Sequence, residues 1–174
     1  MEQEAVCREN VVLIGMPGAG KSTLGVVLAK ILNFAFLDAD LEIQDQYGKP
    51  LHAIITERGP QGFIDVESSV LCGINTQKPT VIATGGSAVY SDQAMQHLAS
   101  IGKVVYLRIS CAELERRLGD LHERGVVMRN GMGMSLQDLF EERLPLYEKY
   151  AQITLDVEDL SITDGARLAA QAVK

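Results

Sequence analysis

Residues 15–23 have the types and spacing of a phosphate-binding loop. They read Gly-Met-Pro-Gly-Ala-Gly-Lys-Ser-Thr and fit G-x-x-x-x-G-K-[ST]. In such a loop backbone N–H groups converge on phosphate oxygens, the lysine reaches the β- and γ-phosphates, and the serine hydroxyl coordinates Mg²⁺. The alternative is a glycine-rich turn that carries Lys-Ser without binding phosphate. We expect a nucleoside triphosphate and Mg²⁺ here, with contacts from Gly15, Gly18, Ala19, Gly20, Lys21, Ser22 and Thr23.

Two carboxylates follow the second apolar run, in Asp38-Ala39-Asp40. If this segment is extended, residues two apart face the same side, and both carboxylates point one way. Beside a phosphate-binding loop, one carboxylate can then hold the hydration shell of Mg²⁺ and the other can meet a substrate hydroxyl. The alternative is that Asp40 caps a helix starting near Leu41 while Asp38 is merely solvated.

A glycine pair and a glycine-rich basic segment are two further candidates. Thr84-Gly85-Gly86-Ser87 ends the third apolar run, where glycines permit a ligand to approach the backbone; a simple turn is the alternative. Residues 119–134 contain glycines, methionines and Arg124, which is typical of a mobile lid over phosphates. An ordinary flexible loop is the alternative there.

These residues need a scaffold that brings them together, and the apolar runs predict one. Five strand-like segments alternate with helical patterns, which indicates a three-layer α/β fold with a parallel sheet and ligands beyond the strand ends. No linker or repeat divides residues 1–174, so we expect one domain, with a substrate flap at about 41–75 and the lid at about 119–134. The predicted strands are Val11–Ile14, Ala35–Leu37, Thr80–Ala83, Val104–Leu107 and Ile153–Leu155.

Helical spacing predicts short helices over Leu41–Tyr47 and Leu51–Thr56, then a helix opened by Pro60 and ending near Cys72. On that last helix Asp65 and Glu67 are expected to be surface charges. Later helical patterns cover Ala112–Leu118, Leu136 to about Ala151, and Ile162–Val173.

The composition limits the partners. A net charge of −7 argues against nucleic acid or an anionic membrane, so an anionic ligand must be held by local arginines, lysines and backbone N–H groups. The three cysteines form no CxxC pair; we expect Cys72 and Cys111 to be small buried hydrophobes. There is no signal-peptide pattern or membrane-length apolar run, which favours the cytoplasm. The oligomeric state is open, with a monomer favoured.

These motifs, taken in order with Arg143-Leu144-Pro145-Leu146-Tyr147, resemble the shikimate kinase family over nearly the whole chain. The resemblance implies a P-loop kinase fold with a five-stranded parallel sheet in the order 2-3-1-4-5. It also implies transfer of the γ-phosphoryl group of ATP to the 3-hydroxyl of shikimate.

The resemblance also suggests roles for individual residues. Lys21 matches the phosphate lysine, and Ser22 and Asp38 match the Mg²⁺ residues. Asp40 matches the aspartate that contacts the substrate hydroxyl, which makes it the candidate general base. Gly85 and Gly86 match the start of a substrate-binding glycine triplet. The matching arginines are Arg117 against adenine, Arg124 in the lid and Arg143 at the substrate carboxylate.

The chain departs from the family pattern at four places. Phe63-Ile64 replaces a Phe-Arg pair, so one carboxylate-binding arginine is missing. Ser87 replaces the third glycine, Arg124-Gly125-Val126-Val127 replaces Arg-Pro-Leu-Leu, and Ile162 stands where the adenine loop usually has proline. The missing arginine would weaken shikimate binding without forbidding it.

We therefore predict an ATP- and Mg²⁺-dependent kinase of a small hydroxylic metabolite, with shikimate the leading acceptor. A different hydroxy acid or a polyol is the alternative acceptor. A catalytically weak nucleotide-binding regulatory protein is the rival from another class, but neither the loop nor the aspartate pair is degraded. A nucleoside-monophosphate kinase is disfavoured by the single compact flap and the few aromatic residues.

Overall fold

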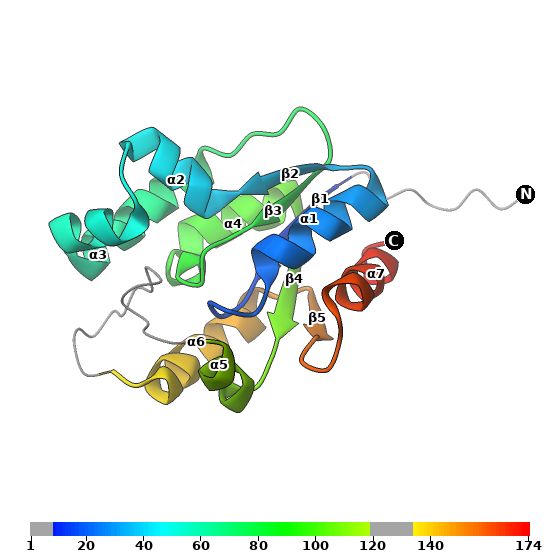
Figure 1. Ribbon diagram of the computed structural model, residues 1–174. Helices are drawn as coiled ribbons and strands as arrows, with labels where there is room; N and C mark the ends of the chain where they lie inside the picture. The colour runs from blue at the N-terminus through cyan, green and yellow to red at the C-terminus, as the bar shows by residue number, and fades with distance from the viewer. Residues whose placement is uncertain (1–8, 119–133) are drawn as a thin grey trace, which may run out of the picture.

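The computed structural model describes residues 9–118 and 134–174, in which five parallel strands form one sheet with helices on both faces (Figure 1). The strand order β2-β3-β1-β4-β5 confirms the expected order. The strands differ from the predicted ones only at their ends: β1 is Asn10–Ile14, β2 Ala35–Asp38, β3 Thr80–Ala83, β4 Gly102–Arg108 and β5 Ile153–Asp156.

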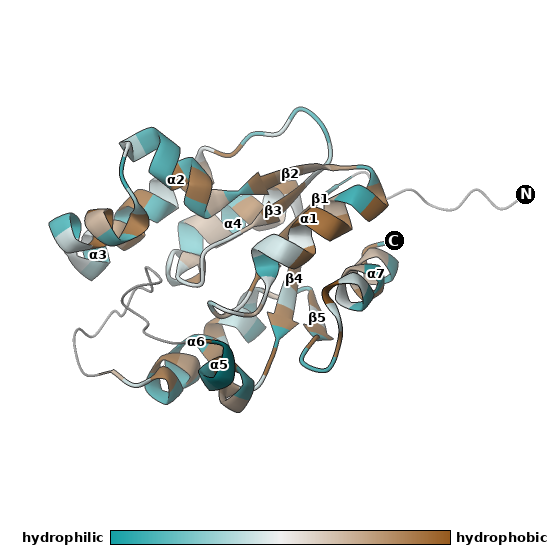
Figure 2. Ribbon diagram, in the orientation of Figure 1, coloured by the Kyte–Doolittle hydropathy of each residue, from teal (hydrophilic) through white to brown (hydrophobic). Residues whose placement is uncertain are grey.

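The central strand explains why the apolar runs lack alternation. Every residue of β1 is buried, because β3 and β4 flank it and helices cover both faces. Val12 is paired with Ile82 on one side and with Val104 on the other, and all three side chains are fully buried. Figure 2 shows the apolar residues gathered on the strands and on the helix surfaces turned toward them.

The helices occupy the two faces as right-handed crossovers require. The chain passes from β1 to β2 through α1, and from β3 back across β1 to β4 through α4, so these two helices cover opposite faces. Helix α7 packs beside α1 (Figure 1). The bounds are α1 Lys21–Leu32, α4 Asp92–Ile101, α5 Cys111–Arg117, α6 Leu136–Tyr150 and α7 Ile162–Ala172.

Helix α4 is missing from the sequence-based prediction, although local signals for it exist. The Ser91 side chain accepts a hydrogen bond from the N–H of Ala94, which caps the helix. Ala94, Met95 and Leu98 are fully buried at helical spacing.

Residues 41–75, the predicted flap, contain most of α2 (Ala39–Tyr47) and all of α3 (Leu51–Cys72). Helix α3 is kinked at Gly59, whose φ of +72° is left-handed, and Pro60 follows at once. This confirms the predicted break. The flap has its own hydrophobic cluster, separate from the main core and built from Ile43, Ile54, Phe63, Ile64, Val66 and Val70.

The structure also bears on the cysteines and on the question of a membrane-spanning helix. Cys72 and Cys111 are only partly buried, so the expectation of buried cysteines is wrong in degree. Among the helices of residues 9–118 and 134–174, none combines the length and the apolar character needed to cross a membrane.

Candidate active site

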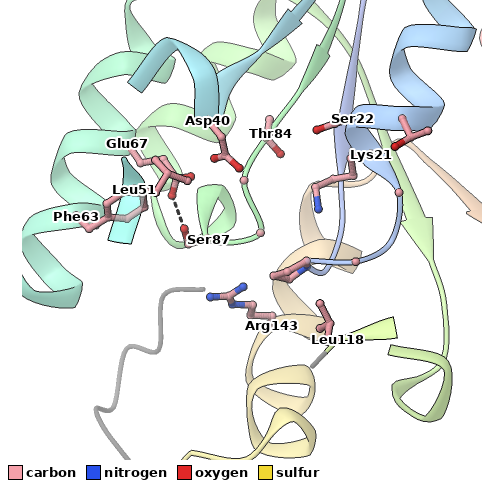
Figure 3. A pocket seen from close by; sticks show the side chains of 16 residues that line it. Lys21, Ser22, Asp40, Leu51, Phe63, Glu67, Thr84, Ser87, Leu118 and Arg143 are labelled. Atoms are coloured by element: carbon pink, nitrogen blue, oxygen red, sulfur yellow. Dashed lines mark hydrogen bonds between the residues drawn. The ribbon is translucent and has the colours of Figure 1, made fainter. Parts of the chain in front are cut away.

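A cavity of about 440 Å³ lies beyond the carboxyl ends of β1 and β3, as expected for a parallel sheet. The phosphate-binding loop forms one wall, α2 and α3 form another, and the loop after β3 and Arg143 of α6 close the remaining side (Figure 3).

The phosphate-binding loop takes its shape from glycines in left-handed conformations. Gly18 has a φ of +85° and Gly20, the N-cap of α1, has a φ of +91°, values that a larger residue rarely adopts. Lys21 Nζ donates to the carbonyl oxygens of Gly15 at 2.7 Å and Met16 at 2.8 Å. Burial lowers the pKa of Lys21 to about 8, while the negative charge of Asp40 opposes this shift. The loop therefore holds a desolvated amine beside the helix N-terminus, where an anion binds well.

Ser22 and Asp38, the two expected Mg²⁺ residues, are in contact. Ser22 Oγ donates to Asp38 Oδ2 at 2.6 Å. A hydroxyl beside a carboxylate presents the oxygen ligands that Mg²⁺ prefers, and it leaves positions for phosphate oxygens and water. The donor set therefore fits this ion.

The two aspartates are not related as we expected. Asp38 ends β2 and caps α2, because its Oδ1 accepts from the N–H groups of Asp40 at 3.0 Å and Leu41 at 3.4 Å. Asp40 is already in the first helical turn, so the extended-segment geometry was wrong, and so was the alternative that Asp40 is the cap. Asp40 lines the cavity, whereas Asp38 faces Ser22.

Burial raises the pKa of Asp40, and the charge of Asp38 raises it further, while Lys21 opposes both. A carboxylate with a raised pKa at the wall of a cavity is suited to accept a proton from a hydroxyl.

Gly85 and Gly86 lie where side chains would block the site. A Cβ on Gly85 would be 2.5 Å from Glu67 Oε2 and 2.8 Å from Asp40 Oδ1. A Cβ on Gly86 would be 2.7 Å from Pro17 Cδ and 2.8 Å from Arg143 Nη1. The two glycines therefore let this loop pack closely against the residues that line the cavity, while the approach of a ligand to their backbone stays a prediction.

Arg143 of α6 is fully buried at the cavity wall. Its Nε donates to the hydroxyl of Tyr90 at 3.2 Å, and its guanidinium lies 5.2 Å from the centre of the Tyr90 ring. One turn further along α6, the Tyr147 hydroxyl donates to the Gly86 carbonyl at 2.7 Å. The same helix thus positions both the arginine and the glycine loop.

Of the other two predicted arginines, Arg117 lies within the described residues and Arg124 lies outside them. Arg117 lies beside the phosphate-binding loop, since its Nη1 donates to the Gly18 carbonyl at 3.2 Å while its Nε pairs with Glu113 at 2.7 Å. Arg124 and the predicted lid (residues 119–134) lie outside the described residues except at Met134.

One charged residue of the cavity was not predicted as a site residue from the sequence. Glu67 is 1% exposed and lines the cavity, so its expected place on the surface was wrong; Asp65 is exposed, as predicted. Burial raises the pKa of Glu67 to about 7, against the opposing hydrogen bond from Ser87. Local sequence offers little signal for this burial, because Ser87 and Gly85, which surround the carboxylate, come from the loop after β3.

Ile64, which stands where the family pattern has an arginine, is not among the residues that line the cavity. It is buried in the flap cluster, while its neighbour Phe63 and Glu67 line the cavity. The position of the missing arginine is therefore part of the flap's hydrophobic cluster.

A phosphate-binding loop that faces a carboxylate and a buried arginine across one cavity, on a 2-3-1-4-5 parallel sheet, defines a P-loop kinase of a small molecule. The family model described as shikimate kinase matches residues 17–174. Proteins named shikimate kinase are similar to the chain: one from Thermobifida fusca is 35% identical, with 94% of both chains covered, and one from Nitrosomonas europaea is 38% identical over 84% of this chain and 70% of its own. The chain belongs to the shikimate kinase family.

Solved structures agree with this assignment. A shikimate kinase from Acinetobacter baumannii, solved in complex with shikimate, has a TM-score of 0.82 and 30% identity, with 97% of this chain and 94% of that chain covered. A gluconokinase from Sinorhizobium meliloti, at 18% identity and a TM-score of 0.54 over 96% of this chain and 92% of its own, shares the fold alone.

Proposed function

We propose that this protein transfers the γ-phosphoryl group of ATP, with Mg²⁺, to the 3-hydroxyl of shikimate. One observation carries the proposal. Lys21 on the phosphate side and Asp40 with Arg143 on the opposite side line the same cavity, so a phosphoryl group and an acceptor hydroxyl can meet between them (Figure 3). The membership of the chain in the shikimate kinase family supports the choice of acceptor.

The proposed roles follow from positioning and charge, which supply most of the catalysis in phosphoryl transfer. Lys21 and the N–H groups of residues 15–23 stabilise negative charge on the transferring group. Ser22 and Asp38 would hold Mg²⁺, which neutralises phosphate charge when bound. Asp40 orients the acceptor hydroxyl and takes its proton, since burial has raised its pKa.

The remaining roles concern the two ends of the cavity. Arg143, buried beside Gly86, is suited to pair with the acceptor's carboxylate, because a guanidinium binds a carboxylate through two parallel hydrogen bonds. Arg117, beside Gly18, is placed to lie against the adenine ring. Arg124 is proposed to close over the phosphates from the lid, as the family resemblance implies. We propose that the flap and the lid belong to one domain with the sheet.

An ATP-consumption assay across shikimate, related cyclic acids, linear hydroxy acids and polyols tests the proposal. We expect the highest kcat/KM with shikimate. Lys21→Ala should lower kcat at least about a hundredfold with the fold retained, because it removes a cation from the transferring phosphoryl group. Near-normal turnover in a folded Lys21→Ala variant would reject the phosphate site. A clear preference for a linear polyol would reject shikimate and leave the kinase.

A further inference from the structure

Glu67 is a buried carboxylate at the acceptor end of the cavity, with no role in the mechanism above. It lies on α3, opposite the phosphate-binding loop (Figure 3). At 1% exposure, its charge loses most of its hydration. A buried carboxylate that lines a ligand cavity needs hydrogen-bond donors, from the protein or from the ligand.

The protein supplies a donor to only one of the two oxygens within the described residues. Ser87, a residue that is 5% exposed, donates from its Oγ to Glu67 Oε1 at 2.6 Å, which fixes the orientation of the carboxylate. Glu67 Oε2 has no hydrogen-bond partner in the same part of the chain. The serine that replaces the expected third glycine is therefore the group that holds Glu67 in place.

The second oxygen and a carboxylate oxygen of Asp40 both lie against Gly85. Glu67 Oε2 and Asp40 Oδ1 lie 2.5 Å and 2.8 Å from the position that a Cβ on Gly85 would take. Because Gly85 has no side chain, both oxygens lie close to its backbone at the cavity wall (Figure 3). Two neighbouring hydroxyl groups of one ligand could donate to this pair of acceptors.

The surrounding charges do not satisfy Glu67 Oε2. Lys21 and Arg143 act on Glu67 through space and favour its charged form, while Asp40 disfavours it. On α3 itself, the positions one turn before and after Glu67 are all buried and apolar: Phe63, Ile64, Val70 and Leu71. With isoleucine at position 64, no cation on that face of the helix pairs with the carboxylate.

We propose that Glu67 binds the acceptor directly, with Oε2 accepting a hydrogen bond from a hydroxyl next to the one that Asp40 orients. The site then selects a small polyhydroxylated acid, with neighbouring hydroxyls at Asp40 and Glu67 and its anionic group toward Arg143. This inference rests on the proposed kinase function and names a specificity residue of the same site.

The test compares Glu67→Gln with the wild type on three acceptors: shikimate and two analogues, each lacking one of the ring hydroxyls that is not phosphorylated. Glutamine keeps the shape and an oxygen for Ser87, but removes the charged acceptor at the Oε2 position. For shikimate we expect KM to rise roughly tenfold to a hundredfold, the value of one charge-assisted hydrogen bond, with the KM for ATP unchanged. For the analogue that lacks the partner hydroxyl, the variant and the wild type should have similar KM values. Asp65→Asn, an exposed acid-to-amide change on the same helix, is the matched control and should leave every KM unchanged.

The other outcomes are distinguishable. An equal KM rise on all three acceptors would show that Glu67 only supports the structure, and an unchanged KM for shikimate would show that it makes no contact; either overturns the inference while the wild-type activity stands. If the wild type phosphorylates none of the three, the proposed function fails and the inference fails with it. Should Glu67→Gln not fold, as judged by circular dichroism, Glu67→Asp provides the same comparison, because it keeps the charge and retracts the oxygen.

Discussion

At the scale of single residues, burial has moved two pKa values in the cavity in opposite directions. The pKa of Lys21 falls to about 8 and that of Glu67 rises to about 7, because desolvation disfavours the charged form of each group. Each group is therefore suited to bind a ligand that replaces its lost hydration: a phosphate for the amine of Lys21 and a hydrogen-bond donor for the carboxyl group of Glu67.

The raised pKa of Glu67 predicts a pH-dependent stability. Between pH 4.5 and about 7 the folded protein binds this proton while the unfolded chain releases it. This contribution of Glu67 to the free energy of unfolding is therefore fully present below pH 4.5 and is lost as pH rises toward 7. Glu67→Gln removes this titration. The Tm of the variant minus that of the wild type should therefore increase by several degrees as pH rises from 4.5 to about 7.

Thermal unfolding of both proteins across this pH range measures the effect, with Asp65→Asn as the exposed control on the same helix. A Tm difference between Glu67→Gln and wild type that stays constant with pH would contradict the assigned shift.

At the scale of elements, the junction of β2 and α2 gives the two aspartates different tasks. Asp38 is the last residue of the strand and the cap of the helix, and it accepts the hydrogen bond of Ser22. Asp40, in the first turn of the helix, lines the acceptor side of the cavity. A single turn thus separates the proposed metal binding from the proposed proton transfer.

Substitutions in this turn should separate the two tasks. Asp40→Asn should lower kcat by roughly a hundredfold or more with little change in ATP affinity, because a general base is lost. Asp38→Asn should instead raise the Mg²⁺ concentration needed for half-maximal rate and, since an amide caps a helix nearly as well, should change stability little. Kinetics under Mg²⁺ titration measure both effects. The same Mg²⁺ dependence in the two variants would argue that neither aspartate has its proposed role.

At the scale of the whole molecule, the phosphate-binding loop forms only when the sheet is folded. Strand β1 is buried at the centre, and the loop joins it directly to α1, against which α7 packs. Ligand bound at the loop is therefore bound only by the folded sheet. Saturating the protein with ATP and Mg²⁺ at about a hundred times Kd should stabilise it by about 3 kcal/mol, which raises Tm by roughly 5–10 °C.

A thermal-shift titration with and without nucleotide checks this expectation, and Lys21→Ala should lose most of the rise. A nucleotide-independent Tm for the wild type would contradict the phosphate site.

The sequence predicts most of this architecture because its signals are local. The run Val11–Ile14 and the glycines of residues 15–23 are contiguous, so the strand and the loop can be recognised without any tertiary knowledge. Helix α4 was overlooked even though Ser91 and the buried Ala94, Met95 and Leu98 mark it.

The misjudged burial of Glu67 depends on contacts distant in sequence. Glu67 is buried by the loop that follows β3. Helical spacing alone could not reveal this environment. The turn after Asp38 was misread for a different reason, since a strand that runs directly into a helix leaves no spacer to mark the change of conformation.

The flap's separate hydrophobic cluster has a consequence for how the protein opens. Phe63 and Ile64 pack within that cluster, whereas Leu71, at the end of the same helix, belongs to the main core. Local unfolding of the flap therefore breaks the small cluster and the hydrogen bond from Ser87 to Glu67 but leaves the sheet intact. The backbone amides of the flap should then exchange with solvent at a lower free energy than those of β1. Glu67 lies on a helix of this less stable flap. Opening of the flap would therefore release the acceptor while the affinity of the phosphate-binding loop for the nucleotide stays unchanged.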